Sequence, residues 1–149
     1  MIVACTRVDQ PGWLALRRQL FPHHADEALL AEMARFCAEP ARYGQFMRLG
    51  DDGTPLGFVE VALRTDYVNG TRTTPVAFLE AILVVPAARR QGIARALVAR
   101  AEAWGRDHGC REFASDAHLD NTASHAMHRG LGFEESQRVV FFRKPIAGA

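Results

Sequence analysis

A short basic loop in the second half of the chain has the residue types needed to bind an anion. It lies between an apolar stretch and an amphipathic segment, and it consists of Arg89, Arg90, Gln91, Gly92, Ile93 and Ala94. A glycine, having no side chain, lets the backbone come close to a ligand. The first N–H groups of a helix have no partner inside it, and the positive end of the helix dipole lies there. The pattern therefore predicts an anion site at a helix start, most naturally for a diphosphate. The alternative is a tight turn with surface arginines.

Two carboxylates have positions from which they could act as bases. Glu80 interrupts the otherwise apolar stretch 76–85. Because an unpaired carboxylate is costly to bury, Glu80 predicts either a cationic ligand or an internal arginine partner. Asp116 follows a predicted strand at 111–115, and ligands gather at strand ends in α/β sheets. Its alternative role is to cap the turn before residue 121. Either carboxylate could accept a proton from an attacking amine.

The apolar pattern predicts the elements that must position these residues. Strands are expected at residues 2–8, 45–49, 56–63, 76–85, 111–115 and 133–143. Helices are expected from Pro11 to Leu20 with Asp9 as cap, from a cap at Asp26 to Cys37, from Gly92 to His108, and at 121–129. Trp13 and Trp104 have helix-core spacing. The order predicts an α/β fold with a mixed sheet.

Composition narrows the class of protein. The 149 residues predict one domain, 1–149, and the content of 48% hydrophobic and 23% charged residues is typical of a globular protein. A net charge of +1 argues against a general nucleic-acid binder. No apolar run approaches the roughly 18 residues of a membrane span, and no signal peptide is apparent. The scattered Cys5, Cys37 and Cys110 form no metal motif, so we expect no metal and a cytoplasmic protein.

Two motifs in the expected order resemble the GCN5-related N-acetyltransferases. The loop Arg89-x-x-Gly92-x-Ala94 is similar to that family's acetyl-CoA loop, Arg/Gln-x-x-Gly-x-Gly/Ala. The second motif is similar to the family's Asn-x-x-Ala/Ser segment ending in Gly-Phe, and it is carried by Asn121, Ser124, Arg129, Gly132 and Phe133. The resemblance implies a central mixed, mostly antiparallel sheet flanked by helices. It also implies acetyl-CoA as co-substrate.

The resemblance assigns the residues that would hold acetyl-CoA. The basic loop would bind the diphosphate, and the pantetheine arm would contact the backbone of Ile82, Leu83 and Val84 and the residues Asn121, Ser124 and His128. Asn121 has the alternative role of a helix N-cap. His128 stands where the family usually has tyrosine. A protonated histidine could protonate the leaving CoA thiolate; alternatively His128 packs and water supplies the proton.

Longer stretches resemble a narrower group, the aminoglycoside 6'-N-acetyltransferases. They are residues 64–70, 75–80, 110–116, 131–135 and 138–144. The resemblance implies a drug site lined by Phe21, Tyr67, Glu80, Asp116 and Gln137. Phe21 stands where related sequences tend to have tryptophan, and Gln137 where they tend to have glutamate, which removes one negative charge. The nearby Asp66 is either a turn residue or a drug contact.

The sequence therefore predicts an enzyme that transfers an acetyl group from acetyl-CoA to the 6'-amino group of aminoglycoside antibiotics, conferring resistance. Transfer would be direct, in a ternary complex, with Glu80 or Asp116 as base. One alternative is an acetyltransferase for a polyamine or another small amine. Another is a module that binds acetyl-CoA without catalysis. The resemblance favours a homodimer, to which a strand near 139–143 could contribute.

Overall fold

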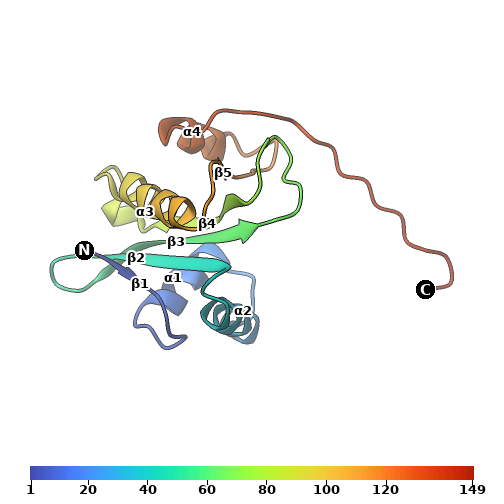
Figure 1. The fold of residues 1–149 in the computed structure, drawn as a ribbon. Coiled ribbons are helices and arrows are strands. Elements are labelled where there is room, and N and C mark those ends of the chain that lie inside the picture. The colour runs from blue at the N-terminus through green and yellow to red at the C-terminus, as the bar shows by residue number, and fades with distance from the viewer. The chain divides into compact units, whose positions relative to one another are not determined.

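The computed structural model describes all residues 1–149, which form two compact units, Met1–Asp116 and Ala117–Ala149. The first unit contains one five-stranded sheet in the order β1-β2-β3-β4-β5 (Figure 1). Its strands are β1 Ile2–Ala4, β2 Tyr43–Leu49, β3 Pro55–Arg64, β4 Val76–Val84 and β5 Phe113–Ala114. Every pair is antiparallel except β4–β5, which is parallel. The predicted mixed, mostly antiparallel sheet is confirmed, although β5 is shorter than expected.

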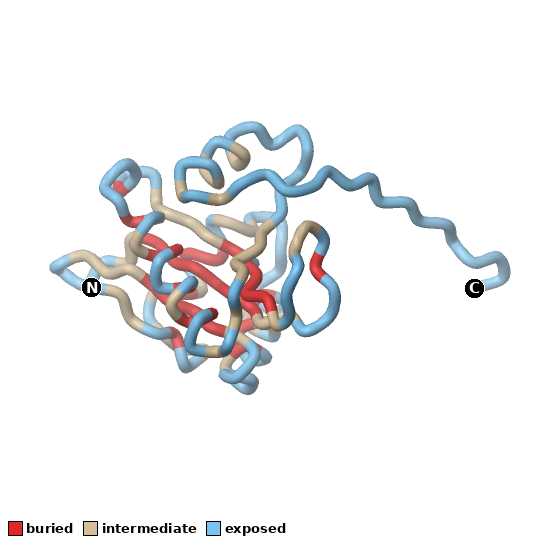
Figure 2. Tube along the Cα trace, turned by 45° about the horizontal axis from the view of Figure 1, so that its top comes forward, coloured by how far each residue is buried: buried red, intermediate tan, exposed pale blue.

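Three helices cover the two faces of this sheet. Helices α1 (Trp13–Leu20) and α2 (Asp26–Ala38) lie on one face, and α3 (Ile93–Asp107) lies on the other (Figure 1). A 3-10 turn, η1 (Pro86–Ala88), precedes α3. The buried residues concentrate in the sheet and in the inner sides of these helices (Figure 2). Trp13 is fully buried and Trp104 is 7% exposed, so the predicted core role of both tryptophans is confirmed.

A buried polar network joins α1 and α2 to the middle of β3. The guanidinium of Arg17 donates to both carboxylate oxygens of Glu60, at 2.8 and 3.2 Å, and the indole of Trp13 donates to the same carboxylate at 3.0 Å. Arg17 also donates to the carbonyl of Leu29 at 3.1 Å and to Glu32 at 2.6 Å. Arg17 is only 1% exposed and Glu60 only 3%. Burial raises the pKa of the Glu60 carboxyl, and the hydrogen bonds from Arg17 oppose that rise.

The predicted caps of the first two helices are wrong. Asp9 forms an exposed ion pair with Arg7 at 2.7 Å, and α1 begins after Gly12, whose φ is +90°. Asp26 is the first residue of α2 rather than its cap, and it pairs with Arg18 at 2.6 Å. In both cases a nearby guanidinium takes the carboxylate that the backbone N–H groups would otherwise bind.

The second unit contains one helix, α4 (Thr122–Gly130), followed by chain without regular structure. The predicted strand at 133–143 is wrong. Residues 134–149 are exposed along their whole length (Figure 2). A strand needs a neighbour to pair its N–H and C=O groups, and the sheet contains only β1 to β5. None of the helices is long and apolar enough to cross a bilayer.

Candidate active site

A β-bulge in β4 turns Glu80 out of the sheet. Glu60 of β3 pairs with Ala81 and the next residue, Val61, pairs with Leu79, so Glu80 is the extra residue between them. Bulges re-aim side chains and are common beside active sites. Leu79 and Ala81 are buried, whereas the Glu80 side chain is 33% exposed. The expectation that Glu80 is a buried carboxylate is therefore wrong.

Glu80 has an internal cationic partner. The guanidinium of Arg64, the last residue of β3, donates to the Glu80 carboxylate at 2.9 Å. The same guanidinium lies 3.6 Å from the centre of the Phe78 ring, a distance at which a cation and a π system attract each other. The predicted alternative of an arginine partner is thus confirmed. Because both side chains are partly exposed, the pair is screened by water and an incoming ammonium group can compete for the carboxylate.

Asp116 lies two residues beyond the end of β5, the strand that pairs with the first half of β4. The parallel pairing joins Ala77 to Phe113 and Phe78 to Ala114, so its register, if continued, sets Asp116 level with Glu80. The pairing ends two residues earlier, at the end of β5. Asp116 is exposed and makes no hydrogen bond or ion pair within the first unit. Glu80 and Asp116 are therefore two accessible carboxylates, each two residues beyond the paired positions Phe78 and Ala114.

Beyond Glu80, β4 has an edge that no strand covers. β5 pairs only with Ala77 and Phe78, so the rest of β4 has β3 as its single neighbour. The N–H of Val85 donates to Leu56 on the β3 side at 2.9 Å. Because backbone groups alternate in direction along a strand, Val84 and Ile82 direct theirs away from β3, whereas Leu83 directs its own toward it. Of the three predicted pantetheine contacts, two thus have the geometry to extend the sheet.

The basic loop has the backbone geometry of an anion site. Arg90 and Gly92 both have positive φ angles, 63° and 78°. A left-handed conformation is unfavourable for arginine, and such strain is typical of functional loops. Helix α3 follows with no side-chain cap and no acidic residue in its first turn. A Cβ atom added to Gly92 would have no neighbour within 4 Å, so the space in front of this glycine is open.

The side chains of this loop divide into two groups. The guanidinium of Arg89 folds back and donates to the carbonyl of Val84 at 3.1 Å, which ties the loop to the end of β4. Arg90 and Gln91 are exposed, whereas Ile93 is buried under the helix start. The loop can therefore offer backbone N–H groups and the exposed positive charge of Arg90 to a diphosphate.

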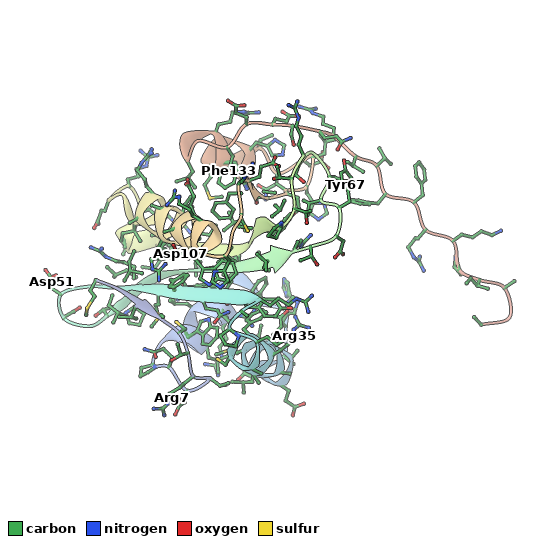
Figure 3. All side chains as sticks on the ribbon, in the orientation of Figure 1. Arg7, Arg35, Asp51, Tyr67, Asp107 and Phe133 are labelled. Carbon is green, nitrogen blue, oxygen red and sulfur yellow. The ribbon has the colours of Figure 1, made fainter.

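The two predicted aromatic contacts lie in different loops. Phe21 follows α1 and is half-buried, with its ring 5.2 Å from that of His24 and 5.3 Å from the Arg17 guanidinium. Tyr67 lies in the loop between β3 and β4 (Figure 3), and it is 76% exposed. Phe21 is thus held by the α1–α2 core, whereas the Tyr67 ring is open to a ligand.

The remaining predicted residues belong to the second unit. Asn121 caps α4, because its side-chain oxygen accepts the N–H of Ser124 at 3.1 Å, which confirms the N-cap interpretation. Nδ1 of His128 lies 2.7 Å from the carbonyl oxygen of Ser124. A carbonyl only accepts, so Nδ1 carries the hydrogen of this bond. Gln137 is exposed and lies outside any helix or strand.

Sequence reasoning missed the buried carboxylate beside this region. Glu60 pairs across the sheet with Ala81, next to the bulge at Glu80. Two signals were present: a single carboxylate within the apolar stretch 55–63, and an arginine four residues after Trp13 on the inner face of a helix. Glu80 gives the same signal in its own strand, so the pattern alone did not distinguish a buried structural carboxylate from an exposed one.

Comparisons with known proteins agree with this geometry. Residues 11–133 match the model of the acetyltransferase (GNAT) family. The chain is 52% identical over 134 residues to an aminoglycoside N(6')-acetyltransferase type 1 of Acinetobacter genomosp. 13, which covers 90% of each chain. The structure is similar to that of the 6'-N-acetyltransferase AAC(6')-Ih from Acinetobacter baumannii, with a TM-score of 0.92, 45% identity and 99% of each chain covered.

A further solved structure has a ligand that joins both substrates. It is AAC(6')-Iy in complex with the bisubstrate analog CoA-S-monomethyl-acetylneamine, and it is similar to this chain with a TM-score of 0.91, 40% identity and 98% of each chain covered. The chain therefore belongs to the acetyltransferase (GNAT) family. The predicted fold is confirmed, and so is the prediction of an acetyl-CoA-dependent N-acetyltransferase.

Proposed function

We infer that this chain transfers the acetyl group of acetyl-CoA to the 6'-amino group of aminoglycosides, a reaction that confers resistance. The observation that carries this inference is the identity of 52% over 90% of both chains to a relative with that activity in its name. The similar structure that holds a CoA–aminoglycoside analog supports the same pair of substrates. The site described above agrees with both, since it combines an anion loop with exposed carboxylates.

We propose that acetyl-CoA binds along β4 and the basic loop. The diphosphate would accept hydrogen bonds from the backbone at Gly92, Ile93 and Ala94, with Arg89, Arg90 and Gln91 around it. The pantetheine arm would pair with the outward backbone groups of Ile82 and Val84. The open edge of β4 and the uncapped start of α3 support this placement. Asn121, Ser124 and His128 of the second unit would complete the cofactor site.

The amine must lose a proton before its nitrogen attacks the thioester carbonyl. Glu80 or Asp116 would accept that proton, directly or through water. The outward N–H of Val84 would polarise the carbonyl, and holding both substrates in line would supply most of the rate gain. The CoA thiolate then leaves. It is protonated by water or by a His128 that carries a hydrogen on Nε2. No covalent enzyme intermediate is needed, so the three cysteines have no role in this chemistry.

The drug would lie between carboxylates and aromatic rings. Its ammonium groups would bind Glu80 and Asp116, and the exposed ring of Tyr67 would cover a sugar face. Phe21 and Gln137 would complete the wall. Because Arg64 already pairs with Glu80, Asp116 is the one of these two carboxylates without an ion pair, which favours Asp116 for the first contact with the polycation.

Three proposals concern the whole chain. We propose that residues 1–149 form one acetyltransferase domain; the family model supports this because its match at 11–133 spans both units. We also propose a homodimer. The exposed tail carries Val140, Phe141, Phe142 and Ile146, which are 74%, 85%, 92% and 82% exposed. Such an apolar run is typical of a contact surface. Since acetyl-CoA is made inside cells, we propose the cytoplasm as the place of action.

The first experiment measures release of CoA from acetyl-CoA with tobramycin and, separately, with spermidine. Mass spectrometry counts the acetyl groups added to each amine. One acetyl on tobramycin, with spermidine inert, is the expected result. Turnover of spermidine alone would favour a polyamine enzyme, and binding of acetyl-CoA without turnover of either amine would favour a non-catalytic module.

A further inference from the structure

The loop between β3 and β4, residues 65–75, is anchored at several points along its length. Val68 is 7% exposed and packs with Val76, Phe78 and Ala114 in a small apolar cluster. The neck of the loop is closed by the hydroxyl of Thr74, which donates to the carbonyl of Thr65 at 3.0 Å. A loop held at its middle and at its neck is a fixed part of the fold rather than a free lid.

Glu112 supplies the strongest of these anchors from a distant part of the chain. One oxygen of its carboxylate accepts the backbone N–H groups of Arg72 and Thr73, each at 2.8 Å, and the hydroxyl of Thr73. Its backbone carbonyl accepts the N–H of Ala77 at 3.1 Å, at the start of β4. Hydrogen bonds to an ionised acceptor are about twice as strong as neutral ones. Glu112 therefore fastens the loop to the start of β4 and of β5.

The anchored loop presents two side chains that have no partner. Tyr67 is 76% exposed, and Asp66 beside it is exposed as well; neither makes a hydrogen bond, ion pair or ring contact. Immediately after them, the buried Val68 holds the backbone. An aromatic ring and a carboxylate on a fixed backbone are suited to a ligand rich in hydroxyl and ammonium groups.

We propose that Glu112 is a positioning residue for the amine substrate: it holds residues 65–75 as a preformed wall that presents Asp66 and Tyr67 to the aminoglycoside. The proposal rests on the function proposed above. Glu112 touches neither substrate, and it acts by keeping the loop ordered before the drug binds. Loss of this anchor leaves the ordering of the loop to be driven by drug binding, which lowers drug affinity and leaves the acetyl-CoA site unchanged.

The test compares Glu112→Ala and Glu112→Gln with the parent enzyme, using KM for tobramycin and KM for acetyl-CoA. We expect Glu112→Ala to raise the tobramycin KM about five- to tenfold and to change the acetyl-CoA KM less than about twofold. Glu112→Gln keeps an acceptor oxygen, so it should recover most of the loss. Asp52→Ala is the matched control, because Asp52 also accepts one loop N–H, that of Thr54 at 3.0 Å, but in the β2–β3 hairpin.

A double-mutant cycle with Tyr67→Ala separates positioning from general stability. If Glu112 acts through Tyr67, its removal adds little to the tobramycin KM once the ring is gone. Equal effects of Glu112→Ala in both backgrounds, or a rise in both KM values together with the Asp52→Ala control, would overturn the proposal. A parent enzyme that leaves tobramycin unacetylated would instead refute the proposed function, so the two failures are distinguishable.

Discussion

The buried network around Arg17 gives the sharpest test of the reasoning about stability. Replacing Arg17 with methionine keeps the volume and removes the charge, which leaves the Glu60 carboxylate, 3% exposed, with Trp13 as its single side-chain donor. Removing one partner of a buried ion pair costs about 3–5 kcal/mol. The free energy of unfolding of a natural domain is about 5–15 kcal/mol in total. Arg17→Met should therefore lower the melting temperature by roughly 9–15 °C.

Replacing Glu60 should cost less stability than replacing Arg17, because Arg17 has other hydrogen-bond partners. In Glu60→Gln, Arg17 keeps Glu32 at 2.6 Å and the carbonyl of Leu29 at 3.1 Å. We expect a loss of about 1–3 kcal/mol, the cost of leaving buried groups imperfectly paired. The double variant Arg17→Met/Glu60→Leu should also lose about 1–3 kcal/mol, chiefly for the unpaired Trp13 indole, and so less than Arg17→Met alone.

Urea unfolding followed by tryptophan fluorescence and circular dichroism measures all three variants. The pH dependence of Arg17→Met gives a second check. Burial raises the folded-state pKa of Glu60 above its unfolded value of about 4.3. The protonated form is favoured in the folded state, so stability is fully present below the unfolded pKa and is lost as the pH rises through the folded pKa. The loss of unfolding free energy caused by Arg17→Met should thus become smaller as the pH falls from 8 to 5. A loss in the double variant as large as that in Arg17→Met, or a loss under about 1 kcal/mol in Arg17→Met, would refute the reasoning.

Further variants test the site, the assembly and the role of Glu112. Gly92→Ala adds a Cβ atom to open space at a φ of 78°. We expect a stability loss of only about 1–2 kcal/mol. The KM for acetyl-CoA, measured with saturating tobramycin, should rise more than about tenfold. Glu80→Ala and Asp116→Ala should each lower turnover with an unchanged circular dichroism spectrum, and full activity in the double variant would remove both from the mechanism. Deleting residues 139–149 should shift the mass measured by light scattering to that of a monomer, whereas an unchanged dimer would place the interface elsewhere. Hydrogen bonds from the Thr73 hydroxyl and the Arg72 amide lower the pKa of Glu112, so its stabilising contribution is present above the unfolded pKa and is lost as the pH falls through the folded pKa. The melting-temperature difference between Glu112→Ala and the parent should hold from pH 8 to 5 and shrink as the pH falls below the unfolded pKa of about 4.3.

Features made by residues close together in the chain were predictable from the sequence. Gly92 lies directly before the first residue of α3, as the loop pattern predicts. Asn121 caps α4 through a hydrogen bond that spans three residues. The helical spacing of Trp13 and Trp104 was enough to place both in the core. In each case the backbone geometry and its nearest neighbours decide the outcome, so a short stretch of sequence contains the physical cause.

Contacts between distant parts of the chain were decided by the tertiary structure. The bulge at Glu80 depends on how β3 and β4 pair. It exposes a carboxylate that the surrounding apolar sequence predicts to be buried. Arg64 reaches Glu80 across 16 residues of sequence, and Arg17 reaches Glu60 across 43. The stretch 133–143 has the apolar residues of a strand, but a strand forms only when it pairs with another strand. The local sequence does not specify that partner, and the sheet contains only β1 to β5. The sequence by itself therefore determined the class of fold, the glycine-containing basic loop before α3 and the kind of enzyme, whereas the packing of distant elements decided which carboxylates are buried, which are paired and which are exposed.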